Sequence, residues 1–369
     1  MNITFRTDAS VKIGSGHVMR CLTLALFMKE QGCNCKFVSK KHEGNLIDKI
    51  SSYGFEVYVL EDFPESSSSP NWQKDALQTK KSINSETIDW LVVDQYELDE
   101  RWEKELRPLV KKIFVIDDLA NRKHVCDVLL DQNLVSNFKT RYQSLVNKSC
   151  KTLLGPQFAL LQPDFQLIRE RKHRVDKIAS ILVYFGGSDI HNLTGKTIEA
   201  FQKLDRGGIR LNVVLGFDSP NKDIIRKQIE QDERISLHNI LPSLAPLMKR
   251  SDLAIGAAGA TTWERCCLGL PSLVITIADN QKAVAEELGS RGLIKYLGHH
   301  DSVSSSSLYS ALEECLEVKS LDDWSEDCMD LVDGLGTRRV CSALMQQDHN
   351  DRITFDNRKA KLASNLGNV

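Results

Sequence analysis

Short apolar runs alternate with amphipathic stretches from the first residues of this chain, and this alternation restricts its fold more than any other feature. The pattern is typical of βα units, in which buried parallel strands are joined by helices that cover the sheet. At 369 residues the chain exceeds one typical hydrophobic core and suits two α/β domains. We therefore expect an α/β fold with a cleft between two domains.

The first half of the chain contains six runs that we expect to form strands. They are Ile3–Arg6, Cys35–Val38, Phe55–Leu60, Trp90–Asp94, Ile113–Asp117 and Val128–Asp131. Between the first two runs, apolar residues recur at helical spacing from Val18 to Met28, and Gly32 suits the C-terminus of that helix. This pattern predicts an N-terminal Rossmann-like domain over residues 1–162.

A charged stretch over residues 163–177 precedes the second half and is expected to be the linker between the domains. The βα pattern then resumes, with strands expected at Ile181–Phe185, Leu211–Gly216, Asp252–Gly256 and Ser272–Ile277. We expect a second Rossmann-like domain over residues 178–300. A helical C-terminal extension is expected over residues 301–347, followed by a polar tail over 348–369.

The composition restricts the partners of the chain. A formal net charge of −2 and an isoelectric point near 6.5 give no basic field for nucleic acid, so a small molecule is the expected ligand. No apolar run approaches the length of a membrane span. Because Arg6, Asp8 and Lys12 interrupt the first residues, a signal peptide is not expected and we predict a cytoplasmic protein.

Three groups of residues are not expected to carry chemistry. The ten cysteines lack the C-x2-C pairing of structural zinc sites, and we expect reduced, mostly buried thiols. Ser66–Ser69 and Ser302–Ser307 are expected to be mobile loops. His299–Asp301 is expected to be an exposed loop rather than a metal site.

The loop after the first expected strand ends in Gly14, Ser15, Gly16 and His17, immediately before the first expected helix. Glycines there let backbone N–H groups approach an anionic ligand. A neutral imidazole at the carboxyl end of a strand can remove a proton from water, which makes His17 a candidate general base. The alternative is that His17 caps or orients the loop. One turn later, Arg20 either faces a phosphate or is solvated.

A second glycine turn follows the first expected strand of the C-terminal domain. Gly187, Ser188 and Asp189 lie in this turn, which can offer amides and a hydroxyl to a diphosphate. The turn lacks the G-K-[ST] sequence of a P-loop, so common ATP hydrolysis is not indicated. A plain connection between a strand and a helix is the alternative interpretation.

The segment Ile255–Glu264 is the most informative part of the second half. Small residues, among them Gly259 and Ala260, bring the backbone close to a ligand, and the hydroxyls of Thr261 and Thr262 can bond phosphate or cap a helix. A glutamate one turn into the helix can accept both hydroxyls of a ribose, as acidic residues do in other nucleotide sites. A capping or solvated glutamate is the alternative.

The polar residues Asp279, Asn280 and Gln281 follow the next expected strand and can reach into the cleft. Asn280 can hold the substrate or the attacking water, whereas the alternative is a helix N-cap formed by Asp279 or Asn280.

Three further carboxylates and one missing motif bear on the chemistry. Asp94, Asp117 and Asp118 end strands and can line the cleft, act as acid or base, or cap helices. The sequence contains no D-x-D triplet, which argues against metal-dependent glycosyltransferases, and we expect neither a metal nor a cofactor.

Taken together, these segments resemble the pseudaminic-acid pathway family of UDP-2,4-diacetamido-2,4,6-trideoxy-beta-L-altropyranose hydrolases. The family's relatives include spore-coat polysaccharide and flagellin-modification proteins. The resemblance covers most of residues 1–345. The matching segments are Arg6–Asp8, Gly14–Leu22, Asp94–Tyr96, Asp117–Arg122, Leu130–Asn133, Phe185–Asp189, Ala257–Glu264 and Asp279–Gln281.

The resemblance implies a GT-B architecture in which the second domain holds UDP and the sugar faces the first domain. The implied proton acceptor for water is His17. The implied ligands of the substrate are Gly187–Asp189 and Ala260–Thr262 at the diphosphate, Glu264 at the ribose, Asn280 at the sugar, and Gly14, Ser15 and Arg20 in the closing loop. The implied reaction is attack of water on the anomeric carbon with departure of UDP, inversion and no metal. Other enzymes of the pathway are possible partners.

Two other functions are compatible with these motifs. The second-domain motifs are shared with the peptidoglycan N-acetylglucosaminyltransferase, so a glycosyltransferase with the same donor site is one alternative. A catalytically idle protein that binds a nucleotide sugar is the other, although His17 and Asn280 are both present. The extension beyond about Gln346 has no assigned role.

Overall fold

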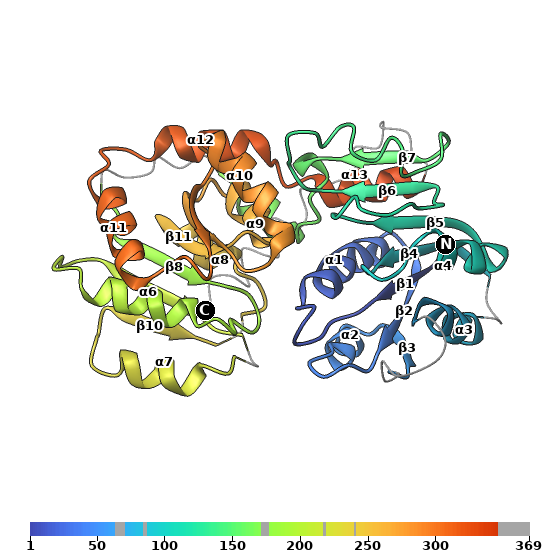
Figure 1. Ribbon diagram of the computed structural model, residues 1–369, viewed down its shortest axis with the longest axis horizontal. Coiled ribbons are helices and arrows are strands. Elements are labelled where there is room, and N and C mark those ends of the chain that lie inside the picture. The colour runs from blue at the N-terminus through green and yellow to red at the C-terminus, as the bar shows by residue number, and fades with distance from the viewer. Residues whose placement is uncertain (63–70, 84–86, 171–176, 217–218, 240, 346–369) are drawn as a thin grey trace.

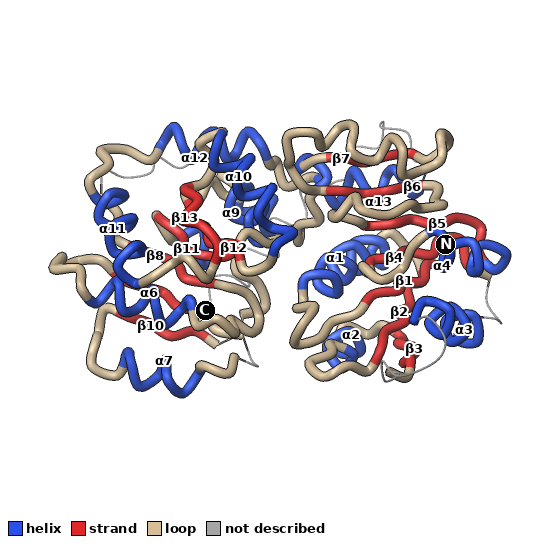
Figure 2. The backbone as a smooth tube through the Cα atoms, in the orientation of Figure 1, coloured by secondary structure: helices blue, strands red, loops and turns tan. Residues whose placement is uncertain are grey.

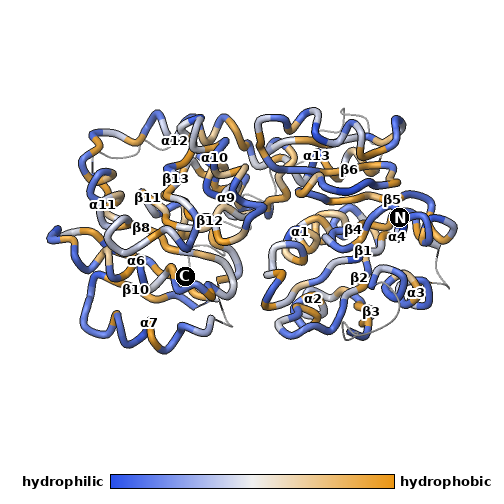
Figure 3. Tube along the Cα trace, viewed as in Figure 1, coloured by the Kyte–Doolittle hydropathy of each residue, from blue (hydrophilic) through white to orange (hydrophobic). Residues whose placement is uncertain are grey.

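The computed structural model describes residues 1–62, 71–83, 87–170, 177–216, 219–239 and 241–345. The chain forms two lobes, and each lobe has a parallel sheet with helices packed around it (Figures 1 and 2). Figure 3 shows apolar residues concentrated along the strands of both sheets. Buried apolar clusters cover both faces of each sheet, as the alternation of strands and helices requires.

The first sheet has the order β3-β2-β1-β4-β5-β6-β7, and all of its ladders are parallel. Its strands are β1 (Asn2–Thr7), β2 (Asn34–Lys40), β3 (Glu56–Leu60), β4 (Ile88–Asp94), β5 (Val110–Ile116), β6 (Val128–Asp131) and β7 (Lys151–Leu154). The direction of winding reverses between β1 and β4. In doubly wound sheets, ligands bind at the carboxyl ends of the strands at this switch point.

The second sheet repeats this topology with the order β10-β9-β8-β11-β12-β13, again with parallel ladders. Its strands are β8 (Ser180–Tyr184), β9 (Arg210–Val214), β10 (Ile235–His238), β11 (Leu253–Ala257), β12 (Ser272–Thr276) and β13 (Lys295–His299). The switch point of this sheet lies between β8 and β11. Both sheets therefore present one crevice each at their strand ends.

The helices of the first lobe and of its connection to the second vary in length, and the longest described ones have 15 and 13 residues. They are α1 (Gly16–Glu30), α2 (Ile47–Ser52), α3 (Asn71–Ile83), α4 (Glu100–Leu106), η1 (Arg107–Leu109), η2 (Pro156–Phe158) and α5 (Pro163–Ile168). The remaining helices are α6 (Leu193–Gln202), α7 (Lys222–Ile229), α8 (Ala245–Arg250), α9 (Thr261–Cys267), η3 (Asp279–Gln281), α10 (Lys282–Ser290), α11 (Ser305–Leu316), α12 (Asp322–Leu331) and α13 (Gly336–Met345).

All ten expected strands are present, and the first expected helix is α1, followed by Gly32 in the left-handed region with φ of +82°. Three strands were not expected from the sequence: β7, β10 and β13. Their side chains are largely exposed or only partly buried. Because an edge strand lacks the continuous apolar run of a central strand, its sequence gives a weaker signal.

Two expectations about loops are wrong in part, although His300 and Asp301 do form a turn after β13 and Ser302 lies before α11. His299 is the last residue of β13 and is partly buried, with Nδ1 at 3.1 Å from Thr276 Oγ1, so it is not part of an exposed loop. Ser304 caps α11 in a reciprocal arrangement with Ser307, so the serine run begins a helix. Serine is favoured at helix N-caps because its oxygen accepts a backbone N–H. The other serine run, residues 66–69, lies outside the described residues.

The cysteines are free thiols, and nine of the ten are buried, as expected. Within the described ranges, no helix combines the length and the apolar character needed to cross a membrane.

Helix α13 returns from the second lobe and packs on the first sheet beside α1 (Figure 1). Val340, Cys341 and Leu344 join the apolar cluster between the sheet and α1. The indole N–H of Trp90 in β4 donates to the carbonyl of Leu344 at 3.2 Å. The last described helix is thus part of the core of the first lobe.

We expect Leu344→Ala to lower the free energy of unfolding by about 2–4 kcal/mol, because truncation of a buried leucine leaves a cavity. Urea denaturation followed by circular dichroism measures the change. Leu77→Ala is the matched control, since Leu77 is 56% exposed on α3, and it is expected to change the value by less than about 0.5 kcal/mol. Equal effects of the two substitutions would show that α13 does not contribute to the core.

Candidate active site

The loops at the switch point of the first sheet bring His17 and Asp94 together. Thr7 in β1 pairs in register with Asp94 in β4, so both strands end at the same level. His17 is the second residue of α1, only 6% exposed, and its Nδ1 lies 2.6 Å from Asp94 Oδ1. Ser15, not His17, occupies the N-cap position of α1, so the interpretation of His17 as a cap is wrong.

The contact with Asp94 determines the proton position on His17. Because a carboxylate only accepts hydrogen bonds, Nδ1–H donates to Asp94 and Nε2 is the basic nitrogen of the neutral ring. We assign this tautomer from the hydrogen-bond network. The same arrangement of carboxylate and imidazole orients the general base in serine hydrolases.

Arg20 completes the group around Asp94. Its Nε and Nη2 donate to the two carboxylate oxygens of Asp94, each at 2.6 Å, and its Nη1 donates to Asp118 at 3.0 Å. Burial alone would raise the pKa of Asp94, but the charges and hydrogen bonds of Arg20 and His17 outweigh it and hold this pKa well below its usual range. Asp94 therefore stays ionised near neutral pH and provides an anionic partner for His17.

This arrangement corrects the expectation for Arg20. The side chain is buried, so it is not solvated, and its guanidinium is already engaged by two carboxylates. Arg20 orients Asp94, because a bidentate pair restricts the carboxylate to one orientation.

A second buried ion network fixes the start of the loop that leads from β1 to His17. Arg6 at the end of β1 binds both oxygens of Asp8 and both oxygens of Asp75 in α3. Asp8 also accepts the backbone N–H of Lys40 at 2.8 Å, and the ammonium of Lys40 pairs with Asp75. Arg6 is fully buried, so these carboxylates supply the neutralisation that its burial requires.

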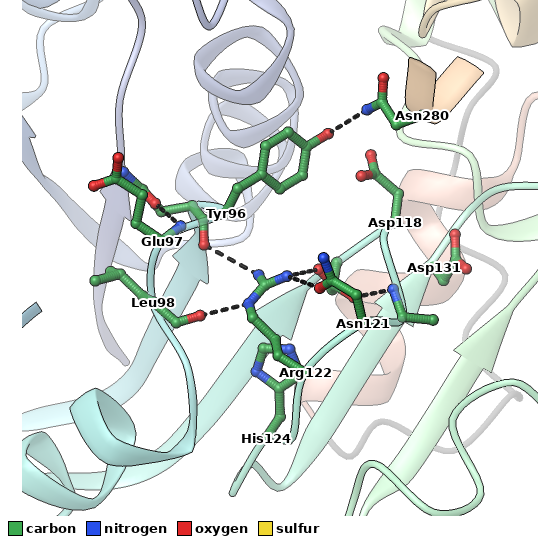
Figure 4. A network of polar contacts seen from close by, with 12 residues as sticks. Tyr96, Glu97, Leu98, Asp118, Asn121, Arg122, His124, Asp131 and Asn280 are labelled. Atoms are coloured by element: carbon green, nitrogen blue, oxygen red, sulfur yellow. Dashed lines mark hydrogen bonds and ion pairs between the residues drawn. The ribbon is translucent and has the colours of Figure 1, made fainter. Parts of the chain in front are cut away.

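Tyr96 joins the two lobes at the site (Figure 4). Its ring stands edge-on to His17 with centroids 4.4 Å apart. Its phenolic oxygen accepts a hydrogen bond from Asn280 Nδ2 at 3.1 Å. Burial, together with the charge of Asp118, raises the pKa of Tyr96 well above its ordinary value, so the phenol stays protonated. Asn280 of η3 thereby contacts the first lobe through Tyr96, whose ring packs against His17.

The structure separates the two adjacent carboxylates Asp117 and Asp118. Asp117 is buried and is bound by Arg122, by Tyr142 and by the backbone N–H of Ala120, so it supports the loop after β5. Figure 4 shows Arg122 donating in turn to the carbonyl of Leu98. Arg122 also donates to the carbonyl of Gln95 at 3.2 Å. Asp118 instead lies with Arg20 and Tyr96 at the site.

Asn280 and Asp279 do not cap a helix. Residues Asp279–Gln281 form the short helix η3, whose N-cap is Ala278, and α10 begins after Gln281 without a side-chain cap. Asp279 pairs with Lys282 at 2.7 Å. Gln281 accepts the backbone N–H of Ile277 and extends its amide nitrogen toward Gly259. Only Asn280 of the three points its side chain to the first lobe.

The glycine loops of the two lobes face one another. Gly14 adopts φ of +80° and donates its N–H to Ser10 at 2.8 Å, which folds the loop back on itself before Gly16 begins α1. A Cβ on Gly187 would stand 3.6 Å from Ser15 Oγ, so the loop after β1 approaches the loop after β8. Ser15 of the first loop therefore lies close to Gly187 of the second.

The carboxylate of Asp189, which was expected to bind the ligand, instead accepts hydrogen bonds from the backbone of α6. Its two carboxylate oxygens accept the backbone N–H groups of Leu193 and Thr194 at the start of α6, each at 2.9 Å. The residue is 6% exposed, and its backbone lies in the left-handed region with φ of +41°. Asp189 thus shapes the loop, whereas Gly187 and Ser188 remain at its surface.

The loop after β11 leads into α9 at the switch point of the second sheet. Ala260 occupies the N-cap position, and no side chain caps α9, so Thr261 and Thr262 are not capping residues. Both threonine hydroxyls instead lie 3.1 Å from nitrogens of Arg265 on the same helix. The surface of this loop is formed by Gly259, Ala260 and Thr261.

Glu264 is partly buried on α9. Burial raises the pKa of Glu264 to about 7, and the charge of Asp164 in α5 acts in the same direction. When burial raises the pKa of a carboxyl group, hydrogen bonds from hydroxyl donors stabilise its ionised form and lower the pKa again. This property suits the predicted partner, a ribose, but does not identify it.

Sequence reasoning missed the contribution of Tyr96 and Arg265 and left Asp94 and Asp118 among several alternatives. The side-chain partners of Asp94 lie 73 or more residues away along the chain, and Tyr96 and Asn280 are 184 residues apart. Asp94 ends β4, which pairs with β1, and β1 leads into the loop that carries His17. This position is the signal that singles out Asp94. Reading that signal requires the strand order.

Comparison with known proteins supports the resemblance found in the motifs. Residues 181–322 match the glycosyltransferase family 28 C-terminal domain. The chain is 28% identical to the UDP-2,4-diacetamido-2,4,6-trideoxy-beta-L-altropyranose hydrolase of Campylobacter jejuni, over 79% of this chain and 97% of that protein. It is 25% identical to the spore coat polysaccharide biosynthesis protein SpsG of Bacillus subtilis, over 96% of this chain and all of that protein.

A further relative is longer than this chain. Protein MJ1062 of Methanocaldococcus jannaschii is 29% identical over 74% of this chain, and the match spans 55% of that protein. The similarity to the hydrolase and to SpsG confirms the resemblance that the motifs indicated.

The fold matches that of a solved glycosyltransferase-type structure. MurG of Acinetobacter baumannii superimposes with a TM-score of 0.68 at 14% sequence identity, over 94% of this chain and 99% of that chain. The expected GT-B architecture, two Rossmann-like sheets facing a cleft with a helical C-terminal part, is confirmed.

We expect Glu264→Gln to raise the free energy of unfolding by about 3 kcal/mol at pH 8 and to leave it unchanged near pH 4. Folded Glu264 keeps its proton up to about pH 7, whereas the unfolded carboxyl ionises near 4.5. The wild type therefore loses stability as the pH rises between these values, and glutamine does not.

Urea denaturation of the ligand-free protein at pH 4, 6 and 8 measures this difference. Glu286→Gln is the matched control because Glu286 is exposed on α10, and no pH-dependent gain is expected from it. A gain of the same size at pH 4 and pH 8 would contradict the assigned cause.

Proposed function

We propose that this protein is a hydrolase of UDP-2,4-diacetamido-2,4,6-trideoxy-beta-L-altropyranose, and that it releases UDP and the free 2,4-diacetamido sugar in pseudaminic acid synthesis. The observation that carries the proposal is the buried pair of His17 and Asp94 at the switch point of the first sheet. The similarity to the Campylobacter jejuni hydrolase over 97% of that protein supports the substrate.

In the proposed reaction, Nε2 of His17 takes a proton from water while the water oxygen attacks the anomeric carbon. The bond between that carbon and the diphosphate oxygen breaks, and UDP leaves with the electron pair. Asp94 stabilises the imidazolium that forms, because its negative charge lies 2.6 Å from Nδ1. Attack opposite to the leaving group inverts the configuration at the anomeric carbon.

The second lobe is the proposed holder of UDP. The loops after β8 and β11 leave several small residues exposed or partly exposed, namely Gly187, Ser188, Gly259, Ala260 and Thr261. Their backbone N–H groups and hydroxyls are the proposed donors that stabilise the departing diphosphate. Glu264 is the proposed acceptor of the ribose hydroxyls. Residues 178–300 would thus form the nucleotide domain of the enzyme.

The first lobe, formed by residues 1–162 together with the returning helix α13, is the proposed sugar side. Ser15 and Gly16 would close over the substrate, and Tyr96 would hold Asn280 next to His17. Asn280 is then placed to bind the sugar or the attacking water. Asp118 offers a further acceptor beside Arg20 and Tyr96.

A glycosyltransferase with the same donor site is the second candidate, because the match to the family 28 C-terminal domain covers residues 181–322. Both candidates require a nucleotide sugar in the second lobe. They differ in the acceptor of the sugar, which is water for a hydrolase.

Purified protein is expected to release UDP and free sugar from the UDP-sugar without an acceptor, and His17→Ala is expected to lower this rate by about 10²–10⁴-fold because the general base is lost. Coupled detection of UDP measures the rate. His42→Ala is the matched control, since His42 pairs with Asp62 and not with Asp94, and it is expected to keep the wild-type rate.

Two results would contradict these assignments. Absence of UDP release from the wild type would exclude a hydrolase, and release that requires an added sugar acceptor would favour the glycosyltransferase. Reaction in oxygen-18 water should place the label in the sugar; label in UDP would exclude attack at the anomeric carbon.

We expect Asp94→Asn to lower kcat by about 10²–10⁴-fold with little change in KM, because asparagine can no longer fix the tautomer of His17 or stabilise its imidazolium. Steady-state kinetics across pH 6–9 measures both parameters. Asp89→Asn is the matched control, because Asp89 lies on the same strand and its partners Asn2 and Lys111 are remote from the site. A Asp94→Asn variant that changes KM alone would assign Asp94 to binding.

A further inference from the structure

Arg265 is a buried cation behind the loop that precedes α9. Its side chain is 2% exposed and lies against β11, where a Cβ on Gly256 would stand 3.0 Å from Nη1. The absence of a side chain at Gly256 therefore makes room for the guanidinium. Glycine at this strand position has a packing reason that the sequence did not reveal.

The hydrogen-bond partners of Arg265 are neutral oxygens. Nη2 donates to the carbonyl of Ala257 at 2.9 Å and to Thr262 Oγ1 at 3.1 Å, and Nη1 donates to Thr261 Oγ1 at 3.1 Å. Its Nε is buried without a hydrogen-bond partner. Over the described ranges, no carboxylate forms an ion pair with Arg265.

Arg265 nevertheless stays charged near neutral pH. Burial lowers the pKa of Arg265 to about 10, which is still above the working range of the protein. The nearest carboxyl in sequence, Glu264, has a pKa raised to about 7 and so gives only partial compensation. Arg6 and Arg20, the other buried arginines near the site, are each bound by two carboxylates. Arg265 is therefore a buried cation with no carboxylate among its hydrogen-bond partners and only partial compensation from Glu264, which is unfavourable in the free protein.

Thr261 connects this cation to the surface of the loop. Its hydroxyl oxygen accepts from Arg265, which leaves the hydroxyl hydrogen free to donate elsewhere, and the residue is partly exposed. A hydroxyl that accepts from a cation becomes a stronger donor, since hydrogen bonds in series polarise one another. Thr262 is turned inward, because it is buried and lies 3.4 Å from the carbonyl of Ala257.

We propose that Arg265 is a positioning residue whose buried charge is completed by the diphosphate of the bound nucleotide, acting through the hydroxyl of Thr261. This inference rests on the proposed function, because it assigns the anion at the loop to a nucleoside diphosphate. The anion supplies the counter-charge that the free protein lacks, and Arg265 strengthens the donor that stabilises it as UDP leaves.

Titration of the full-length protein with UDP and with uridine tests the proposal. Arg265→Met keeps the length of the side chain and removes its charge. We expect this variant to bind UDP at least 10-fold more weakly, to bind uridine as the wild type does, and to have a melting temperature equal to or above that of the wild type without ligand. A purely structural role would lower stability and weaken both ligands together.

Thr261→Val supplies the second arm and does not depend on the folding of the first variant. It is expected to weaken the binding of UDP but not that of uridine. The double variant Arg265→Met/Thr261→Val is expected to lose little more UDP affinity than Arg265→Met does. Thr261→Ser keeps the hydroxyl and should restore wild-type affinity. If Arg265→Met folds poorly, Arg265→Lys takes its place and is expected to keep part of the UDP affinity.

The outcomes separate the inference from the proposed function. A wild type that binds no UDP would overturn both. A wild type that binds UDP, with variants of equal affinity, would overturn only the role of Arg265. Additive losses in the double variant would show that Arg265 does not act through Thr261.

Discussion

The carboxylate of Asp94 is the contact on which the arrangement of the site depends. It ends β4 beside β1, and its two oxygens bind the guanidinium of Arg20 and the imidazole of His17 at the start of α1. Because Arg20 holds the carboxylate in one orientation and keeps it ionised, the imidazole has one preferred tautomer. The strand, the helix and the proton-accepting nitrogen are thereby fixed relative to one another.

Sheet topology explains why residues from distant parts of the chain meet. Both sheets reverse their winding between the first and fourth strands of their sequence, and the loops that follow those strands carry His17 and Tyr96 in one lobe and Gly187 and Thr261 in the other. Parallel strands place all of these loops at one edge of each sheet. The hydrogen bond between Asn280 and Tyr96 then joins the two edges across the lobes.

The buried charges of the two lobes are satisfied in different ways. In the first lobe, Arg6 and Arg20 are each matched by two carboxylates, so both guanidinium groups have their counter-charges within the protein. In the second lobe, Arg265 has only neutral acceptors among its hydrogen bonds. In the proposed reaction, an oriented base in the first lobe and a buried cation in the second are complementary requirements for removing a charged leaving group.

The sequence by itself determined the central strands, the helix after the glycine loop, the two α/β lobes and the candidate status of His17 and Asn280, because buried parallel strands need continuous apolar runs and their loops collect at one edge. Only the tertiary structure decided which carboxylate serves His17, that Arg20 and Asp189 have structural partners, and that Arg265 is buried without an anion. Those facts depend on strand order and on contacts between residues far apart in the chain, which local residue patterns do not encode.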